Sequence, residues 1–208
     1  MAHKHSQRAG FTLIEMLAVM LILGILVAFL VTQLGRSEDT AKERLTRTRL
    51  AELSALIDSY ERSQGDYPPS AMTPEQGVPP NALNLGVEVL VATLWSKGRD
   101  GMGISADDLR NTDGDQSTKT LTDLPTNDLF ELVDLWENPL AYFHHADYGR
   151  VDRYQTFDNQ TGEISENEVR ALVNPTTRLH YQPGRYQLLS AGSDGVFGTE
   201  DDIGNFGR

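Results

Sequence analysis

The feature that most constrains this chain is an uninterrupted apolar run near its N-terminus. Residues 16–35 carry no charged side chain, and Leu, Ile, Val, Ala, Met and Phe fill nearly all of these 20 positions. At about 1.5 Å per residue, a helix of this length spans about 30 Å, the thickness of the hydrocarbon core of a bilayer. The alternatives are a buried core helix or a secretory signal, but the apolar part of such a signal has only about 7 to 15 residues. The run therefore predicts a membrane helix.

Charged residues around the run predict its orientation. The leader of residues 1–10 carries Lys4 and Arg8 and no acid. Positive flanks stay on the cytoplasmic side, so we expect a cytoplasmic N-terminus in the bacterial inner membrane and a periplasmic body from about Arg36 onward. The net charge of −12 argues against nucleic acid as a partner. The chain has no Cys, which excludes disulfides and thiolate chemistry.

Glu15 does not fit a simple anchor, because the apolar run has already begun with Phe11 and Leu13. An acid at membrane depth costs free energy and indicates a functional role with a cationic partner. The alternative is an acid at the start of a helix, stabilised by the helix dipole among the lipid head groups. The first interpretation needs a cation at the same depth.

The helix is expected to continue beyond the membrane. Apolar residues recur at intervals of three and four from Leu45 to Tyr60, with charged residues on the other faces. We expect one helix over residues 11–63, terminated by Gly65 and the prolines that follow it. Its first half, residues 11–35, is the membrane half, and its second half, residues 36–63, is amphipathic.

Residues 64–208 are predicted to form a globular α+β domain. Short apolar segments alternate with long polar connections, which favours a small antiparallel sheet over a wound parallel one. The long N-terminal helix would pack on this sheet. The expected elements are a helix over residues 87–97 and strands over residues 140–145, 150–157 and 185–190.

The residues around the start of the run resemble a known signal. GFTLIEM, residues 10–16, follows a short basic leader and precedes the apolar run. This arrangement is similar to the signal of type IV pilins and type II secretion pseudopilins, which share the pilin fold. The resemblance implies that a prepilin peptidase cleaves after Gly10 and methylates the new amine of Phe11. It also implies that Glu15 pairs with the N-terminus of a neighbouring subunit in a filament.

Two later segments resemble the major pseudopilins of type II secretion. DLWENPLAY, residues 134–142, is similar to their D-P-W-G-N-P-x-x-Y segment, from which Leu135 and Glu137 depart. YQLLSAGSDGVFGTEDDI, residues 186–203, is similar to the strand and calcium loop that end them. Residues 98–130 and 146–180 have no counterpart in this resemblance, and whether the chain is a major or a minor subunit stays open.

The loop of residues 191–203 is the candidate metal site. Three of its four carboxylates belong to aspartates, Glu200 has no assigned role, and the glycines among them let the backbone fold back on itself. Oxygen ligands without His or Cys suit a hard cation, and a flexible loop suits Ca²⁺ better than Mg²⁺. The alternative is a solvated acidic turn. By resemblance, the ligands would be the side chains of Asp194, Asp201 and Asp202, with the carbonyls of Ala191 and Thr199.

Two other groups of residues are weaker candidates. His144, His145 and Asp147 resemble part of a metal site, but neighbouring residues on a strand point to opposite faces, so we expect ordinary strand positions. Residues 111–117 have oxygen-bearing side chains at alternate positions, as in an EF-hand loop. They lack its Gly and its final Glu, so we expect a solvated loop there. No catalytic motif is present, and we expect no enzyme.

The sequence therefore predicts a structural filament subunit. It would assemble with other pseudopilins, on an inner-membrane secretion assembly platform, into a periplasmic pseudopilus that drives protein export. One alternative is a type IV pilin for adhesion, motility or DNA uptake. Many such pilins close a C-terminal loop with a disulfide, so the missing Cys and the acidic loop favour secretion. The other alternative is a membrane-anchored calcium-binding protein that does not polymerise.

Overall fold

A computed structural model describes residues 11–96, 98–158 and 161–207. The chain divides into two compact units, residues 1–41 and 42–208. Helix α1 (Leu13–Gln64) has 52 residues, beginning in the first unit and ending in the second. It agrees with the helix expected over residues 11–63 to within two residues at its start and one at its end.

The first unit is the apolar part of α1. Leu13–Leu30 is long and apolar enough to cross a membrane, and none of this segment is buried within the protein. Every side chain from Phe11 to Leu30 is exposed. Each Å² of apolar surface left in water costs about 25 cal/mol, so this segment needs lipid or other apolar side chains around it. One N-terminal helix thus serves as a membrane anchor.

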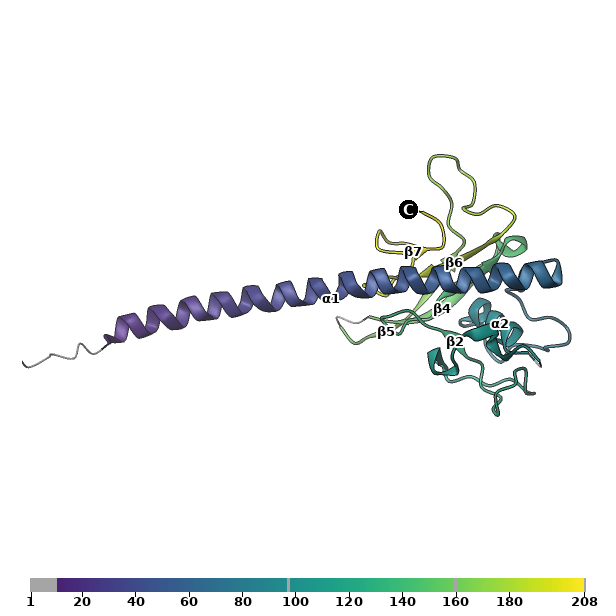
Figure 1. Cartoon of the computed structure of the whole chain (residues 1–208), viewed down its shortest axis with the longest axis horizontal. Coiled ribbons are helices and arrows are strands. Elements are labelled where there is room, and N and C mark those ends of the chain that lie inside the picture. Colours follow the sequence, from purple (N-terminus) through teal and green to yellow (C-terminus); the bar gives the residue numbers. More distant parts are fainter. Residues whose placement is uncertain (1–10, 97, 159–160, 208) are drawn as a thin grey trace, which may run out of the picture. The chain divides into compact units, whose positions relative to one another are not determined.

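Among the described residues, the second unit is an α+β domain built from the part of α1 after residue 41, a shorter helix and three small antiparallel sheets (Figure 1). One sheet pairs β1 with β2, another pairs β4 with β5, and the third has the order β3-β6-β7. The predicted fold class is confirmed, although the single expected sheet is divided into three. The elements are α2 (Leu85–Leu94), η1 (Asp100–Gly103), η2 (Ala106–Asp108), β1 (Leu109–Arg110), β2 (Glu131–Leu132), β3 (Ala141–His144), η3 (His145–Asp147), β4 (Val151–Phe157), β5 (Ile164–Arg170), β6 (Tyr186–Ser190) and β7 (Ile203–Gly204).

The second half of α1 contributes one apolar stripe to the core of the second unit. Leu50, Leu53 and Ile57 are buried there, at the helical spacing of three and four residues that the sequence shows. They belong to the same hydrophobic cluster as residues of α2, β3 and β6. Polar contacts reinforce this packing, since Arg185 donates to Asp58 at 2.7 Å and the Tyr186 hydroxyl donates to the Ser54 carbonyl.

The predicted strands match β3, β4 and β6 within one residue, but β5 was not predicted. Its sequence, ISENEVR, has no apolar alternation, and Val169 is its only buried residue. It forms because it pairs along its full length with β4, from Val151 opposite Arg170 to Phe157 opposite Ile164. Pairing with a neighbouring strand, and not its own pattern, makes this segment a strand.

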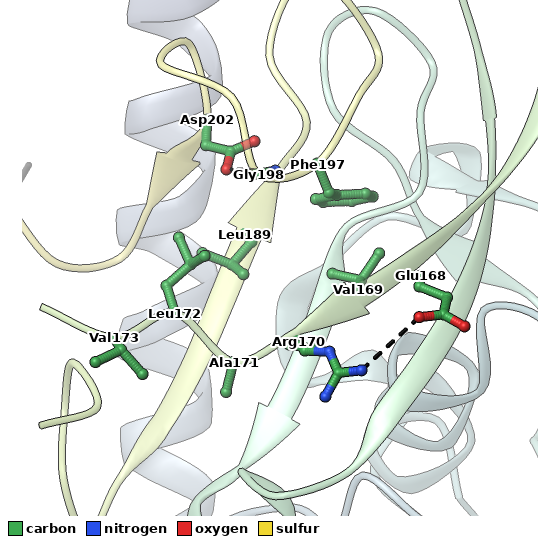
Figure 2. Close-up of a pocket in the computed structure, with 10 residues that line it drawn as sticks. All are labelled: Glu168, Val169, Arg170, Ala171, Leu172, Val173, Leu189, Phe197, Gly198 and Asp202. Atoms are coloured by element: carbon green, nitrogen blue, oxygen red, sulfur yellow. Dashed lines mark hydrogen bonds and ion pairs between the residues drawn. The ribbon is translucent and has the colours of Figure 1, made fainter. Parts of the chain in front are cut away.

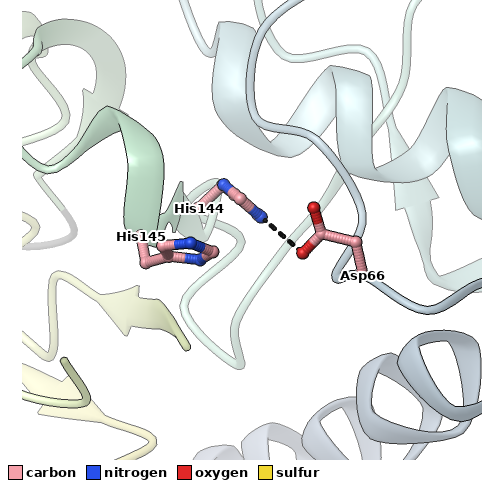
Figure 3. Close-up of side chains that lie close together, drawn as sticks. All are labelled: Asp66, His144 and His145. Carbon is pink, nitrogen blue, oxygen red and sulfur yellow. Dashed lines mark hydrogen bonds and ion pairs between the residues drawn. The ribbon is translucent and has the colours of Figure 1, made fainter. Parts of the chain in front are cut away.

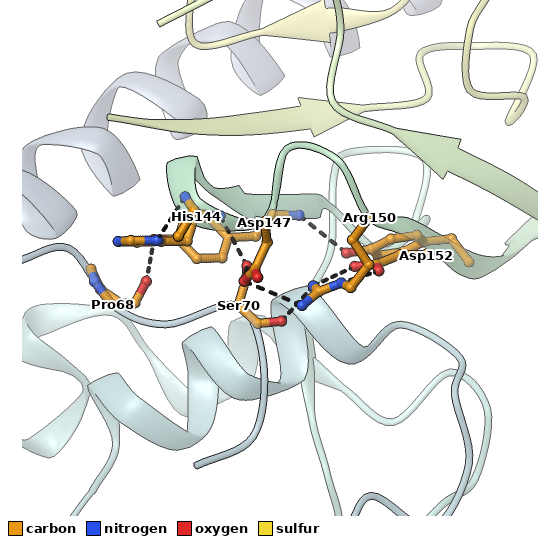
Figure 4. A network of polar contacts seen from close by, with 9 residues as sticks. Pro68, Ser70, His144, Asp147, Arg150 and Asp152 are labelled. Atoms are coloured by element: carbon orange, nitrogen blue, oxygen red, sulfur yellow. Dashed lines mark hydrogen bonds and ion pairs between the residues drawn. The ribbon is translucent and has the colours of Figure 1, made fainter. Parts of the chain in front are cut away.

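A polar network fixes the chain that follows α1 to the strands (Figure 4). The Ser70 hydroxyl donates to Asp147 at 2.7 Å and accepts from the backbone of His144 at 3.0 Å. Arg150 donates to the Ser70 carbonyl at 2.7 Å and also to Asp152 at 2.7 Å. Asp147 thus holds a loop in place and does not take part in a metal site with the two histidines.

Candidate functional site

The start of α1 carries the residues expected to act in processing and assembly. Gly10 lies outside the described residues, and the Phe11 side chain is 77% exposed. The Thr12 backbone N–H and hydroxyl donate to Glu15 Oε2 at 2.8 and 2.7 Å, and the Glu15 N–H donates back to the Thr12 hydroxyl at 3.3 Å. This is a capping box, in which the two side chains satisfy N–H groups at the start of a helix.

The cap supports the second interpretation of Glu15, that of a helix-start acid, within a single chain. Pairing with a cation makes a different demand on the side chain. A cap needs only an oxygen acceptor, which Gln also offers at this position, whereas pairing with an amine needs the negative charge. The two roles can therefore be separated by substitution.

The two histidines lie together, contrary to the sequence-based expectation (Figure 3). The rings of His144 and His145 are 4.2 Å apart, because β3 ends at His144 and η3 begins at His145, where the alternation of a strand no longer applies. His144 Nε2 lies 3.2 Å from Asp66 Oδ1. His144 Nδ1 accepts from the Ala146 N–H at 3.2 Å, so Nε2 carries the proton and donates to Asp66. The His144 ring is thus used in hydrogen bonds.

The C-terminal loop brings two of its three candidate ligand carboxylates together. Asp201 Oδ2 accepts from the backbone N–H of Asp194 and from the Ser193 hydroxyl, both at 3.0 Å, and the Thr199 hydroxyl donates to Asp201 Oδ1. Burial raises the pKa of Asp194, and the neighbouring Asp201 carboxylate adds to this shift. Burial has the same effect on Asp201, but its three donor residues outweigh it and lower the pKa of that carboxyl group.

Asp202 lies apart from this pair. It is buried, and its Oδ2 accepts from the Gly198 N–H at 2.9 Å beside Phe197 and Leu189 (Figure 2). Within the described residues, the loop carboxylates do not form a group of three whose oxygens lie within 4.8 Å of one another. The sequence-predicted side chains are therefore on one loop, but they do not converge in this conformation.

The chemistry of the loop nevertheless fits a hard cation. Its side-chain donors are oxygens, and Gly192 lies so close to Asp201 that a Cβ there would be 2.6 Å from Oδ2. Gly192 also has a φ of +68°, which other residues rarely adopt. This turn allows the backbone to approach the carboxylate, where Ca²⁺ would find both carbonyl and carboxylate oxygens. The ligand set of Asp194, Asp201, Asp202, Ala191 and Thr199 remains a prediction.

The segment that resembles D-P-W-G-N-P supports the base of this loop. Asp134 Oδ1 accepts from the backbone N–H groups of Trp136 and Asn138 at 2.8 and 3.0 Å, and its Oδ2 accepts from the Ser190 hydroxyl at 2.6 Å. The Ser190 hydroxyl in turn accepts from the Gly192 N–H at 3.1 Å. The buried Asp134 therefore connects its own turn to the first residues of the C-terminal loop.

The loop of residues 111–117 is only partly solvated, whereas we expected a solvated loop. Both carboxylate oxygens of Asp115 are buried, and the Asp113 carboxylate lies beside those of Glu88 and Glu131. Sequence reasoning missed Glu88 and Glu131 because they come from distant segments. The only signal was a single acid inside the otherwise apolar segment that forms α2.

Comparisons with known proteins give one match to the N-terminal motif and several matches that cover most of the chain. Residues 5–31 match the family model of the prokaryotic N-terminal methylation motif. Three relatives are each named type II secretion system core protein G. The protein of Pseudomonas aeruginosa is 30% identical over 71% of this chain and 82% of its own length. The protein of Klebsiella michiganensis is 32% identical over 98% of this chain and 95% of its own length. The protein of Escherichia coli K12 is 24% identical over 97% of this chain and 92% of its own length.

No solved structure matches the chain. Two of these relatives share at least 30% of their residues with it over most of their own length, and the motif at its N-terminus is the one that the sequence indicated. The chain therefore belongs to the family of type II secretion system core protein G, the pseudopilins.

Proposed function

We propose that this protein is a subunit of a periplasmic pseudopilus, with a structural and not a catalytic role. The observation that carries the proposal is the apolar segment Leu13–Leu30 of α1, in which no residue is buried within its own chain. In the membrane, lipid covers this surface. In a filament, the same surface of neighbouring subunits would replace lipid, so a subunit could leave the membrane without exposing the helix to water.

Processing would create the charge that assembly needs. A prepilin peptidase would cleave after Gly10 and methylate the Phe11 amine, leaving a cation four residues before Glu15. In an apolar filament core, the Glu15 carboxylate of one subunit and the amine of another would neutralise each other, which offsets the cost of burying either charge. The inner-membrane assembly platform would add subunits one at a time. The globular unit would stay on the periplasmic side.

We also propose that Ca²⁺ binds the C-terminal loop. Asp194, Asp201 and Asp202 would supply side-chain oxygens, and Ala191 and Thr199 would supply carbonyls. The ion would neutralise the repulsion between the Asp194 and Asp201 carboxylates and tie the loop to the end of β6. A chain without Cys has no disulfide for this task. Bound Ca²⁺ would thus stabilise the folded unit by mass action.

The experiment that tests assembly compares Glu15→Gln with Glu15→Ala in cells that express the full secretion system. Gln keeps an oxygen for the helix cap but removes the charge, and Ala removes both. If charge pairing drives assembly, both variants insert and are cleaved after Gly10, but both form fewer than about a tenth of the wild-type filaments in shearing or crosslinking assays. Mass spectrometry of the mature N-terminus checks the cleavage.

The same experiment separates the alternatives. Normal filaments from Glu15→Gln, together with their loss in Glu15→Ala, would assign Glu15 to the helix cap and refute the pairing. A wild-type protein that never polymerises after cleavage would support a membrane-anchored monomer. Filaments that extend from the cell surface and leave secretion unchanged when the gene is deleted would indicate a type IV pilin.

A further inference from the structure

A group of buried acids lies in the second unit, away from the C-terminal loop. Glu88 comes from α2, Asp113 and Asp115 from the loop after β1, and Glu131 from β2. One carboxylate oxygen from each of Glu88, Asp113 and Glu131 lies within 4.8 Å of the other two. Asp115 acts on Glu88 more strongly than the other two acids do. Residues that are distant in the sequence therefore bring three carboxylates within 4.8 Å of one another, and Asp115 is a further acid beside Glu88.

Glu88 has no partner for its charge. The residue is 1% exposed, and neither carboxylate oxygen has a hydrogen-bond partner within the described part of the chain. The same holds for both carboxylate oxygens of Asp115. An unsatisfied buried polar atom costs free energy, and an unpaired buried carboxylate costs more. A packed apolar side chain in place of Glu88 would avoid this cost, so the carboxylate needs another explanation.

The groups that do contact the cluster are neutral. Glu131 accepts from the Asn84 side chain at 3.2 Å and from the Thr112 N–H at 2.8 Å. Asp113 accepts from the Asn81 side chain at 2.9 Å. Burial, together with the neighbouring acids Asp115, Glu131 and Asp113, raises the pKa of Glu88 to about 10. Burial also raises the pKa of Glu131 to about 8. Within the described residues, no cation is among the groups that contact the cluster.

The first part of the loop between β1 and β2 is folded so that Asp113 and Asp115 are partly buried. Asn111 Oδ1 accepts from the N–H groups of Gly114 and Asp115 at 2.8 and 3.1 Å, and the Asn111 side-chain amide donates to the Asp115 carbonyl at 2.8 Å. Gly114 makes the turn with a φ of +75°. This turn places the Asp113 carboxylate beside the buried Glu88, although the loop lacks the EF-hand Gly and Glu.

We propose that this cluster binds a second Ca²⁺, held by the side chains of Glu88, Asp113, Asp115 and Glu131. Four carboxylates can supply the six to eight oxygens that Ca²⁺ prefers, because each can bind through one or both atoms. Mg²⁺ keeps several waters in most sites, for which a buried cluster has less room. The ion would connect α2, the loop of residues 111–117 and β2. The proposal does not depend on filament assembly or on the C-terminal loop.

The test counts bound Ca²⁺ in the full-length protein in detergent, stripped with EDTA and titrated with CaCl₂ by calorimetry and equilibrium dialysis. We expect two equivalents for the wild type. Glu88→Gln, which is nearly isosteric, should lose one equivalent, and Asp194→Ala combined with Asp201→Ala should lose the other. If the C-terminal loop binds no Ca²⁺, the wild type binds one equivalent, and only Glu88→Gln loses it. The two proposals can therefore fail separately.

The controls separate binding from folding. Glu163→Gln removes an exposed acid and should leave the stoichiometry unchanged. In EDTA at neutral pH, Glu88→Gln should melt at a higher temperature than the wild type, because it removes a buried acid whose raised pKa makes it take up a proton on folding, at a cost in stability. If Glu88→Gln loses its near-ultraviolet circular dichroism, it has not folded, and Asp115→Asn then provides the same test. Wild-type stoichiometry in whichever of these two variants folds would overturn the proposal. Tighter binding of Mg²⁺ than Ca²⁺ would overturn the choice of ion.

Discussion

At the scale of single residues, Glu137 has a backbone conformation that does not suit its side chain. Its φ is +66°, in the left-handed region, and it stands where the major pseudopilins have Gly in the similar segment. A side chain in this conformation costs about 1 to 2 kcal/mol relative to Gly. Replacing Glu137 with Gly would remove this cost. Gly would also give the unfolded chain more conformational freedom, which lowers the stability of the fold by about 0.4 to 1 kcal/mol. The departure from the family pattern therefore has a measurable consequence.

We predict that Glu137→Gly stabilises the protein by about 0.5 to 1 kcal/mol, seen as a rise of about 1 to 4 °C in the melting temperature. Glu137→Ala is the matched control, since it removes the charge but keeps the Cβ, and it should produce no such rise. Equal stabilisation by both variants would show that the charge, and not the backbone, is unfavourable at this position.

The residues of the sites differ in how far the sequence could predict them. The GFTLIEM motif and the C-terminal loop are continuous segments, so their residues could be named from the sequence. The contact between His144 and His145 depends on where β3 ends, and strand ends are hard to predict. Glu88 and Glu131 are 43 positions apart in the numbering and meet only through the packing of α2 on β2. Single-sequence patterns carry no information on such a contact.

At the scale of elements, α2 packs very closely on β3. Gly86 lies in the first turn of α2, and a Cβ there would be 2.7 Å from the Tyr154 hydroxyl and even closer to the Tyr142 carbonyl. The Tyr154 hydroxyl also accepts from the Tyr142 N–H at 3.2 Å. These groups are buried and cannot move away without breaking other contacts. The position therefore requires Gly for its small size and not for its backbone conformation.

We predict that Gly86→Ala destabilises the protein by about 1 to 3 kcal/mol, as overpacking does in other cores. The melting temperature should fall by about 2 to 12 °C. Gly149→Ala is the control, because no atom lies within 4 Å of its Cβ and its backbone is outside the left-handed region. That variant should melt within about 2 °C of the wild type. A similar fall for both variants would contradict the close packing of α2 on β3.

Elements with their own periodicity were predictable, and elements defined by their partners were not. The stripe of α1 and the apolar segments of α2, β3 and β6 show their burial in the sequence. By contrast, β5 is mostly polar, with Val169 as its one buried residue, and β1, β2 and β7 are two residues each. Such short or polar strands exist because a neighbouring strand provides hydrogen bonds, which a single-sequence pattern does not reveal.

At the scale of the whole molecule, the two units have opposite relations to water. The first exposes an apolar helix surface, whereas the second encloses a hydrophobic cluster of its own. The residues of α1 that enter this cluster, Leu50, Leu53 and Ile57, all lie after the boundary at residue 42. The same is true of Asp58, which pairs with Arg185 at 2.7 Å. The second unit thus includes every part of α1 that its core uses.

We therefore predict that residues 42–208 form a soluble monomer that unfolds cooperatively, whereas the full chain needs detergent. A shorter fragment, residues 59–208, is the control. It lacks three buried apolar side chains, each worth about 2 to 5 kcal/mol by comparison with truncation to Ala. Their sum approaches the whole stability of a typical domain, about 5 to 15 kcal/mol. The shorter fragment should aggregate or lack a thermal transition. If it folds as well as the longer one in calorimetry, α1 is not part of the core, and the second unit begins after the helix.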